Sequence, residues 1–558
     1  MMNPPRARTN GAGVPSMSAK LPIGIDDFRA LREQGLTYVD KSHFICELID
    51  RPGAQAVLLL RPRRFGKSLA LSMLRCYFDR QGPDLGHLFE GLAVARAGER
   101  HRAHFRRYPV IQLGCQDLVH ARWEAVQWAM REKIRDLFDA HRAVLDIGAP
   151  GALERERFGQ ILDGSAPDGL YRRALLDLSR ALHRAHGEKV MLLIDDCDAP
   201  VHAGHVHGYQ REAADLVRGL LATGLEGNPH LARAVLTGVT GAALSGNLAV
   251  YSLLRDEFAT CFGFTGSEVD MLVAPGQPDV GGVDARDLGG LLARWYGGHR
   301  AGRHDLYSPS SVLSFLADSR ARPRPYWLRT GDRDPARHLL ARAWPLLAPL
   351  LAGESVTWAL DDSVPDGLAR TRGALYSLLV FCGWLRAVER PASDTSTVTM
   401  DEDMHDIESE ATRAPEHTLS VPNREVRALL RSMLTDQPGA TPDPGPAEAE
   451  PGSPSLGDIE TGPAGAQPSD HLRQDSADIE RDSRDDIERG SRDDLLPRHP
   501  GRTRRDRDQS RSPRERRPDI LADADAFEER LQSFFEEMRA TSDVPAGGDS
   551  DAPGDEHG

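Results

Sequence analysis

The chain has 558 residues and a formal net charge of −15, and 40% of its residues are hydrophobic. This length allows two or three domains, each with its own core. From Asp436 onward there are 31 acidic and 16 basic residues, so the preceding part is close to neutral. The balance argues against a broadly basic body that binds nucleic acid.

The N-terminal segment, residues 1–20, contains Pro, Gly and Arg but no hydrophobic core, so it is predicted to be disordered and is not a signal peptide. No apolar stretch approaches the roughly 18 residues of a membrane span, so no membrane association is expected. Six cysteines are scattered without a CxxC pair, which favours reduced thiols. These features together predict an intracellular, cytoplasmic protein.

Residues 21–272 alternate short apolar runs with helix-like periodicity. Four runs are predicted to be buried strands, at residues 56–60, 108–113, 189–195 and 232–238. Buried strands separated by helices are typical of a parallel sheet covered on both faces, which predicts a three-layer αβα fold. In residues 273–436 helical patterns dominate, and a second, helical domain is expected there.

The composition changes at residue 437. Residues 437–519 are rich in Pro, Gly, Asp, Arg and Ser, and "DIERDSRD" recurs as "DIERGSRD", so a disordered low-complexity linker is predicted. Within it, Arg502–Asp519 is either a solvated linker or a weak electrostatic contact for nucleic acid. Residues 520–540 are expected to form an amphipathic helix that docks on the protein's own core or binds a protein partner. Residues 541–558 are expected to be a disordered tail.

The stretch "LLLRPRRFGKSLALSML", residues 58–74, resembles a phosphate-binding loop between a strand and a helix. Gly66, Lys67 and Ser68 supply a glycine, a cation for the outer phosphates and a hydroxyl for Mg²⁺. The chain has five lysines, and one of them stands between this Gly and Ser, where an arginine cannot replace a compact ammonium. Arg61 occupies the position of the first glycine in the general pattern.

A second apolar run ends in carboxylates, in "VMLLIDDCD". Asp195 can hold Mg²⁺ and Asp196 can orient an attacking water, as phosphoryl transfer requires. The alternative is a helix N-cap. Thr237, at the end of the predicted strand 232–238, is a candidate γ-phosphate sensor or a residue of a simple turn.

These segments resemble the AAA-ATPase-like family, whose members often carry a C-terminal PD-(D/E)XK nuclease domain. The resemblance rests on an ordered set of segments. They are "LPIGIDDFRALREQGLTYVDKSHFICELID", "RPRRFGKS", "LLIDDCDAPV", "LTGV", "GFTGSEV", "WYGGHRAGRHDLYSPSSVLSFL" with "YWLRTG", and "LSVPNREVRALL".

The resemblance implies that the loop residues wrap the phosphates, namely Arg61, Pro62, Arg63, Arg64, Phe65, Gly66, Lys67 and Ser68. It further implies that Asp195 and Ser68 hold Mg²⁺, and that Asp196 stands where the family has a catalytic Glu. Asp40 and Lys41 match its Y-V-D-K element and are expected to shape the nucleotide pocket.

Three departures from the family pattern bear on activity. Asp196 is one methylene shorter than Glu, Gly241 stands where an Arg is usual, and no nuclease motif is found, so nuclease activity is not expected. The sequence therefore predicts a P-loop protein that binds ATP and Mg²⁺, with Lys67, Asp196 and Thr237 as catalytic candidates. It is either a slow ATPase acting as a nucleotide-dependent switch or a non-hydrolysing nucleotide-binding or interaction module.

Overall fold

The computed structural model describes residues 20–147, 150–241, 244, 247–273, 285–318, 322–327, 344–360, 372–390 and 415–435. These residues all lie in one compact unit. The predictions for residues 1–19 and 437–558, including the helix at 520–540, fall outside the described residues.

A five-stranded parallel sheet forms the centre of the N-terminal part. Its strands are β2 (Val110–Gly114), β3 (Val190–Asp195), β4 (Leu231–Gly238), β1 (Ala56–Leu60) and β5 (Ala249–Tyr251), in that spatial order. Every residue of β1 and β3 is buried, as expected for strands covered on both faces. Because β4 lies between β1 and β3, the ends of all three strands meet at one edge of the sheet.

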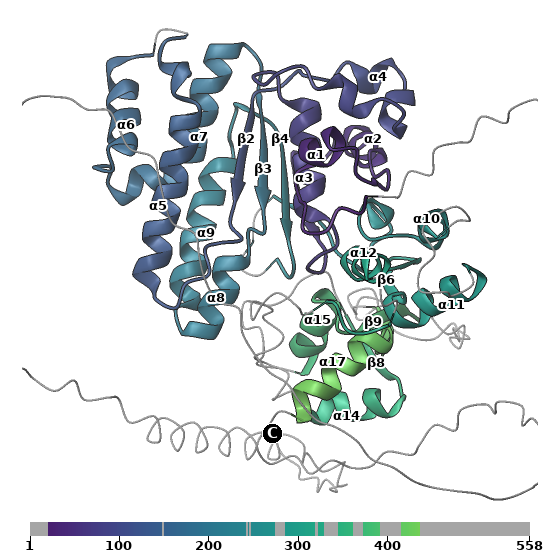
Figure 1. Ribbon diagram of the computed structural model, residues 1–558. Coiled ribbons are helices and arrows are strands. Elements are labelled where there is room, and N and C mark those ends of the chain that lie inside the picture. Colours follow the sequence, from purple (N-terminus) through teal and green to yellow (C-terminus); the bar gives the residue numbers. More distant parts are fainter. Residues whose placement is uncertain are drawn as a thin grey trace, which may run out of the picture. The chain divides into compact units, whose positions relative to one another are not determined.

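Helices cover both faces of this sheet, with α5, α7 and α9 on one side and α1 and α3 on the other (Figure 1). The helices on the first side are α5 (Trp123–Ala140), α6 (Ala152–Leu162), α7 (Asp168–His186), α8 (Ala199–His207) and α9 (Gln210–Leu225). The helices on the second side are α1 (Phe28–Glu33), α2 (His43–Asp50), α3 (Lys67–Phe78) and α4 (Glu99–Arg102). The predicted α/β class, a sheet between two helical layers, is confirmed.

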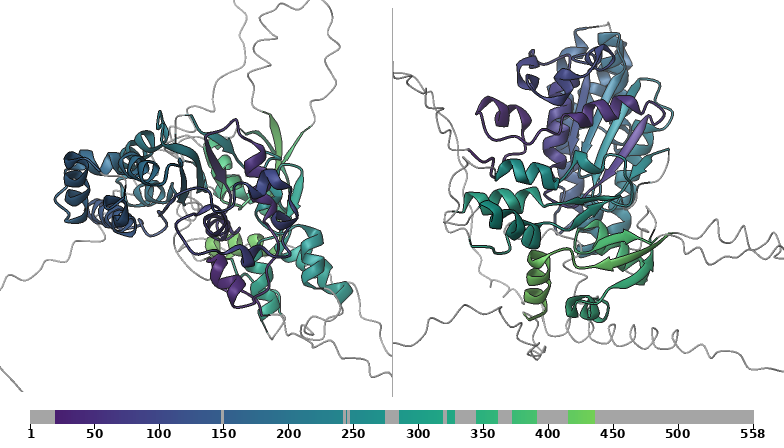
Figure 2. Two further views of the ribbon diagram at one scale, coloured as in Figure 1. Left: turned by 90° about the horizontal axis from the view of Figure 1, so that it is seen from above. Right: turned by 90° about the vertical axis from the view of Figure 1, so that its right-hand side faces the viewer.

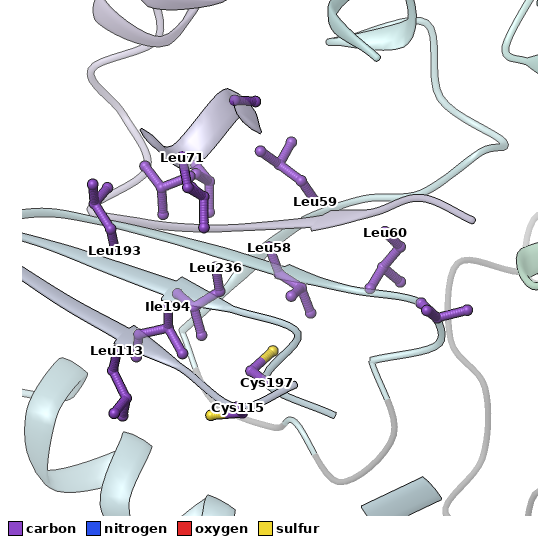
Figure 3. Close-up of a cluster of buried hydrophobic side chains, with 14 of the residues drawn as sticks. Leu58, Leu59, Leu60, Leu71, Leu113, Cys115, Leu193, Ile194, Cys197 and Leu236 are labelled. Atoms are coloured by element: carbon purple, nitrogen blue, oxygen red, sulfur yellow. The ribbon is translucent and has the colours of Figure 1, made fainter. Parts of the chain in front are cut away.

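The core of the sheet consists of aliphatic side chains from adjacent strands. Leu58 and Leu60 of β1, Leu236 of β4 and Ile194 of β3 lie close together (Figure 3), and each is at most 1% exposed. Burial of this many aliphatic groups fixes the register of the strands. The polar residues that follow each strand are therefore held at defined positions.

The C-terminal part combines helices with two small antiparallel sheets. The helices are α10 (Gly266–Leu272), α11 (Ala285–Tyr296), α12 (Pro309–Ala317), α14 (Trp344–Ala352), α15 (Arg372–Phe381) and α17 (Arg424–Thr435). The first sheet pairs β6 (His299–Ala301) with β7 (His304–Leu306). The second has the order β8 (Val356–Ala359), β10 (Glu416–Ser420), β9 (Arg386–Glu389), and Figure 2 shows its strands in teal and green.

The structure differs from the predicted organisation in two respects. The region expected to be helical contains the five short strands β6 to β10, which the sequence pattern did not indicate. Moreover, Trp384, Leu419 and Val426 belong to the same hydrophobic cluster as the strands of the parallel sheet. Part of the region after position 272 therefore packs into the core of the parallel sheet, while a second cluster forms around Tyr296 and Phe315.

Candidate nucleotide-binding site

The loop between β1 and α3 turns sharply at two residues with positive φ. Arg64 has φ 65° and Gly66 has φ 88°, and Gly66 directly precedes Lys67, the first residue of α3. A Cβ at Gly66 would meet no atom within 4 Å, so the left-handed backbone, rather than crowding, favours glycine here. The first N–H groups of a helix have no intrahelical partner, so this helix start can bind an anion.

Lys67 lies at the centre of the site and is buried, with an exposed fraction of 5%. Its ammonium donates hydrogen bonds to the carbonyl oxygens of Arg61, at 3.2 Å, and Pro62, at 3.3 Å. It also forms an ion pair with the carboxylate of Asp196, at 3.2 Å between Nζ and Oδ1. The cation is thus fixed at the inner side of the loop, beside the end of β3.

Asp195, Thr237 and Ser68 form a connected cluster of oxygen atoms. Thr237 donates a hydrogen bond from Oγ1 to Oδ1 of Asp195 at 2.5 Å, and accepts one from the backbone N–H of Asp196 at 3.2 Å. Ser68 also forms a side-chain hydrogen bond with Asp195. Burial, followed by repulsion from Asp196, raises the pKa of Asp195, whereas the bonds from Ser68 and Thr237 and the charge of Lys67 oppose that rise.

This cluster also meets the requirements of Mg²⁺. The Ser68 hydroxyl and the Asp195 carboxylate are hard oxygen ligands, and Mg²⁺ in nucleotide sites takes one or two such protein ligands together with phosphate oxygens and waters. Among the described residues, no group of three or more His, Cys, Asp or Glu side chains forms a self-sufficient metal cage. The donor set fits a metal that arrives with a phosphate ligand.

Arg61 has a different environment from the one expected of a phosphate ligand. Its side chain is fully buried, and its guanidinium donates to five main-chain carbonyls, of Leu60, Tyr251, Ser252, Glu257 and Phe258. It also lies 5.3 Å from the ring centroid of Phe262, and its own N–H donates to the carbonyl of Gly238. Arg61 therefore ties the end of β1 to the segment after β5, and its guanidinium faces away from the cleft.

A cleft of about 810 Å³ adjoins the loop. Lys67, Ser68 and Asp196 contribute to one wall. The rest of the phosphate loop, residues 63–66, and residues of α1 and α3 also line it. Further lining comes from residues 22–26, 37–39, 41 and 261–264, and from the C-terminal residues Pro309, Ser310, Leu313, Ser314, Tyr326 and Trp327. A pocket of this size, with an apolar body and a few converging polar groups, fits a nucleotide.

The C-terminal part contacts the phosphate loop directly. Trp327 donates a hydrogen bond from Nε1 to the carbonyl of Arg63 at 3.4 Å, and Arg64 donates one to Ser310 at 3.3 Å. The ring of Phe65 packs edge-on against His299, with 5.2 Å between the centroids. Three successive loop residues are therefore held by residues that lie more than two hundred positions later in the chain.

A buried carboxylate supports this contact. Glu425, in the first turn of α17, is 0% exposed, and its Oε1 accepts hydrogen bonds from the N–H groups of Tyr326, at 2.7 Å, and Trp327, at 3.0 Å. Burial raises its pKa to about 7. The two hydrogen bonds, a further one from Ser311 and the charge of Arg64 all act in the opposite direction. Glu425 lies in the segment "LSVPNREVRALL", and its role was not predicted from the sequence.

Asp198 is a second residue whose role the sequence analysis did not identify. It is 1% exposed, and its Oδ2 accepts hydrogen bonds from the N–H groups of Val239, Thr240 and Gly241, at 2.7–3.0 Å. Its pKa is lowered even though burial alone would raise it, because the charge of nearby His202 and these bonds favour the carboxylate. Asp198 thus fixes the loop that follows Thr237.

The Y-V-D-K element lies at the other end of the cleft. Lys41 donates to Glu268, at 2.7 Å, and to the carbonyl of Thr260, at 2.8 Å, while Asp40 accepts from the N–H groups of Ser42 and Ala93. Burial lowers the pKa of Lys41, and the charge of Glu268 counteracts this. These bonds hold the cleft wall together, and Lys41 itself lines the cleft.

Comparison with known proteins agrees with this geometry. Residues 22–246 match the family described as AAA-ATPase-like, "Predicted AAA-ATPase". A curated protein of Azotobacter chroococcum mcd 1, named "Uncharacterized protein in vnfD 5'region", is 31% identical over 320 residues, which cover 56% of this chain and 54% of that protein. The chain thus spans about half the length of this relative.

In the described part of the chain, no helix has both the length and the apolar composition needed to cross a membrane. The matched segment includes the phosphate loop, the carboxylates after β3 and the threonine at the end of β4, which the structure brings to one edge of the sheet. Residues 22–246 are therefore similar to the AAA-ATPase-like family in both sequence and the placement of these segments.

Proposed function

We propose that this protein binds ATP with Mg²⁺ in the cleft and hydrolyses it slowly. The bound nucleotide would control the conformation of the C-terminal part. The observation that carries the proposal is the convergence of Lys67, Ser68, Asp195 and Thr237 from three adjacent elements. The helix start after Gly66 would bind phosphate oxygens through its N–H groups. Mg²⁺, held by Ser68 and Asp195, would neutralise phosphate charge.

Each polar side chain then has a defined task. Lys67 binds the outer phosphates, and Thr237 orients Asp195 and the backbone of Asp196 through its hydroxyl. Asp196 is the candidate for positioning the attacking water. It lies at the cleft wall, and its φ of 46° is a conformation that Asp adopts more readily than most residues.

The contacts between the loop and the C-terminal part support the switching role. A phosphate that displaces the Lys67 ammonium from the Arg61 and Pro62 carbonyls acts on the same loop whose Arg63 carbonyl is held by Trp327. Binding at the loop and the position of Trp327 are thereby linked along the main chain of adjacent residues. A second route runs through Arg64 and Ser310.

A specific observation also favours the second candidate, a nucleotide-binding module that does not hydrolyse ATP. Asp196 forms an ion pair with Lys67 at 3.2 Å through Oδ1, which restricts the orientation of its carboxylate toward an attacking water. Its side chain is also shorter than Glu, and an error of about 1 Å at such a position can cost on the order of a hundredfold in rate.

Two measurements on the full chain separate these candidates: ATP binding by calorimetry and phosphate release. We expect wild type to bind ATP in the presence of Mg²⁺ and to release phosphate slowly, and Lys67→Ala to lose at least about tenfold in affinity. Wild-type binding without phosphate release, together with release by Asp196→Glu, would identify the non-hydrolysing module. If Lys67→Ala binds ATP as tightly as wild type, the site itself is wrong.

A further inference from the structure

Transfer of the γ-phosphoryl group requires positive charge beside the outermost phosphate. In this chain the loop after β4 does not supply it. Gly241 has φ 66°, and a Cβ there would lie 3.3 Å from side-chain atoms of both Leu58 and Leu60. Its N–H is also held by Asp198. The backbone at this position is built around glycine, so a cation in addition to Lys67 would have to come from another position.

The phosphate loop contains three arginines, and the side chains of two of them donate hydrogen bonds to other parts of the protein. Arg61 donates to five carbonyls behind the sheet edge, and Arg64 donates to Ser310 of α12. Burial lowers the pKa of Arg64, and the charge of Glu425 counteracts this, so Arg64 also belongs to the contact with the C-terminal part. Neither guanidinium is available to a ligand without breaking a structural contact.

Arg63 differs from both neighbours. Among the described residues its side chain donates no hydrogen bond, whereas those of Arg61 and Arg64 do. Arg63 lines the cleft, as Arg64 does, and its Nε is buried without a partner, as is that of Arg61. Within the described ranges, no carboxylate lies within ion-pair distance of its guanidinium. A buried guanidinium nitrogen without an acceptor carries a desolvation cost that an anion in the cleft would remove.

A hydrogen bond holds the main chain of Arg63, and its charge acts on a neighbouring helix. Its carbonyl accepts the hydrogen bond from Trp327, so its backbone cannot rotate freely. Besides burial, which is the larger effect, the charge of Arg63 lowers the pKa of His202 on α8. The charge of Arg63 therefore lies within electrostatic range of α8, and Arg63 lines the same cleft as Asp196.

We propose that Arg63 is the γ-phosphate ligand of this site and makes the protein distinguish ATP from ADP. The inference rests on the proposed nucleotide binding and adds its specificity: Lys67 and the helix start serve both nucleotides, whereas Arg63 contacts the group that only ATP has. A charge-assisted, bidentate contact of arginine with phosphate is geometrically specific, and a lysine cannot reproduce it.

The test compares ATP and ADP affinities by isothermal titration calorimetry with Mg²⁺, using the full-length chain. Wild type is expected to bind ATP at least about tenfold more tightly than ADP, since hydrogen bonds between charged groups contribute about 1.5–3 kcal/mol. Arg63→Gln should lower ATP affinity by about tenfold or more and change ADP affinity by less than about threefold. Arg63→Lys should recover only part of the difference.

Arg75→Gln, which removes an exposed arginine from α3, is the matched control and should leave both affinities unchanged. Equal wild-type affinities for ATP and ADP overturn the proposal without any variant, as does an equal loss of both affinities in Arg63→Gln. Failure of the nucleotide site itself has a different signature: wild type then binds neither ATP nor ADP. The wild-type ratio remains decisive even if a variant does not fold.

Discussion

Replacing Glu425 with Gln tests whether the buried carboxylate beneath Trp327 has the energetic role that its surroundings imply. Glutamine has nearly the same shape, and its carbonyl oxygen can still accept the hydrogen bonds that Tyr326 and Trp327 donate to Oε1. The substitution removes the ability to ionise and replaces Oε2, which has no hydrogen-bond partner, with an NH2 group. Besides the N–H groups of Tyr326 and Trp327, the Ser311 hydroxyl and the charge of Arg64 act on this carboxyl.

The magnitude follows from the shift in the pKa of Glu425, from 4.5 to about 7. A carboxyl whose pKa is raised by folding holds its proton more tightly in the native state. The free energy of unfolding therefore falls as pH rises from about 4.5 to about 7 and is constant beyond. At about 1.4 kcal/mol per pKa unit, the ionised wild-type side chain costs about 3 kcal/mol at pH 8.

Thermal unfolding of wild type and Glu425→Gln at intervals between pH 4.5 and pH 8.5 measures this effect. The two proteins should have equal stability near pH 4.5, and the variant should become progressively more stable, by several degrees at pH 8. Glu389→Gln, which changes an exposed carboxylate on β9, should show no such divergence. A stability difference that is independent of pH, or a variant that is less stable at pH 8, would refute the reasoning.

Three further substitutions test the contacts around the loop, each by thermal unfolding of the full chain. Arg61→Lys should lower stability by about 3 kcal/mol, because one ammonium cannot reach the five carbonyls that the guanidinium contacts. Asp198→Ala should cost about 3 kcal/mol, since it leaves three buried N–H groups without their acceptor. Gly241→Ala should cost about 1 kcal/mol or more, because a Cβ is disfavoured at positive φ and would crowd Leu58; no loss would show that the loop can relax.

The parallel sheet was predictable because its strands are continuous aliphatic runs. The predicted strand 56–60 coincides with β1, and 189–195 and 232–238 agree with β3 and β4 within one residue at each end. The predicted strand 108–113 is displaced slightly, since β2 spans Val110–Gly114. Strand β5 was missed because "AVY" is only three residues long, and all three are partly exposed.

The site was predictable only where function requires a residue type at a fixed distance along the chain. Lys67 and Ser68 follow Gly66 directly, so their convergence is local. Trp327 and Arg63 are 264 residues apart, and no periodicity relates them. Arg61 shows the opposite problem: a basic residue in a phosphate loop suggests an anion, yet tertiary packing directs its guanidinium to backbone carbonyls.

The ion pair between Lys67 and Asp196 gives a physical reason to expect slow turnover. A phosphate that binds Lys67 must compete with the Asp196 carboxylate and with two loop carbonyls, so nucleotide binding and release of Asp196 are coupled. That exchange frees Oδ1 of Asp196 to reorient toward an attacking water. Even then its short side chain restricts how closely it approaches the reacting phosphate. The same exchange alters the loop segment that Trp327 and Ser310 hold, so in the proposed function the event that enables hydrolysis also reaches the C-terminal part.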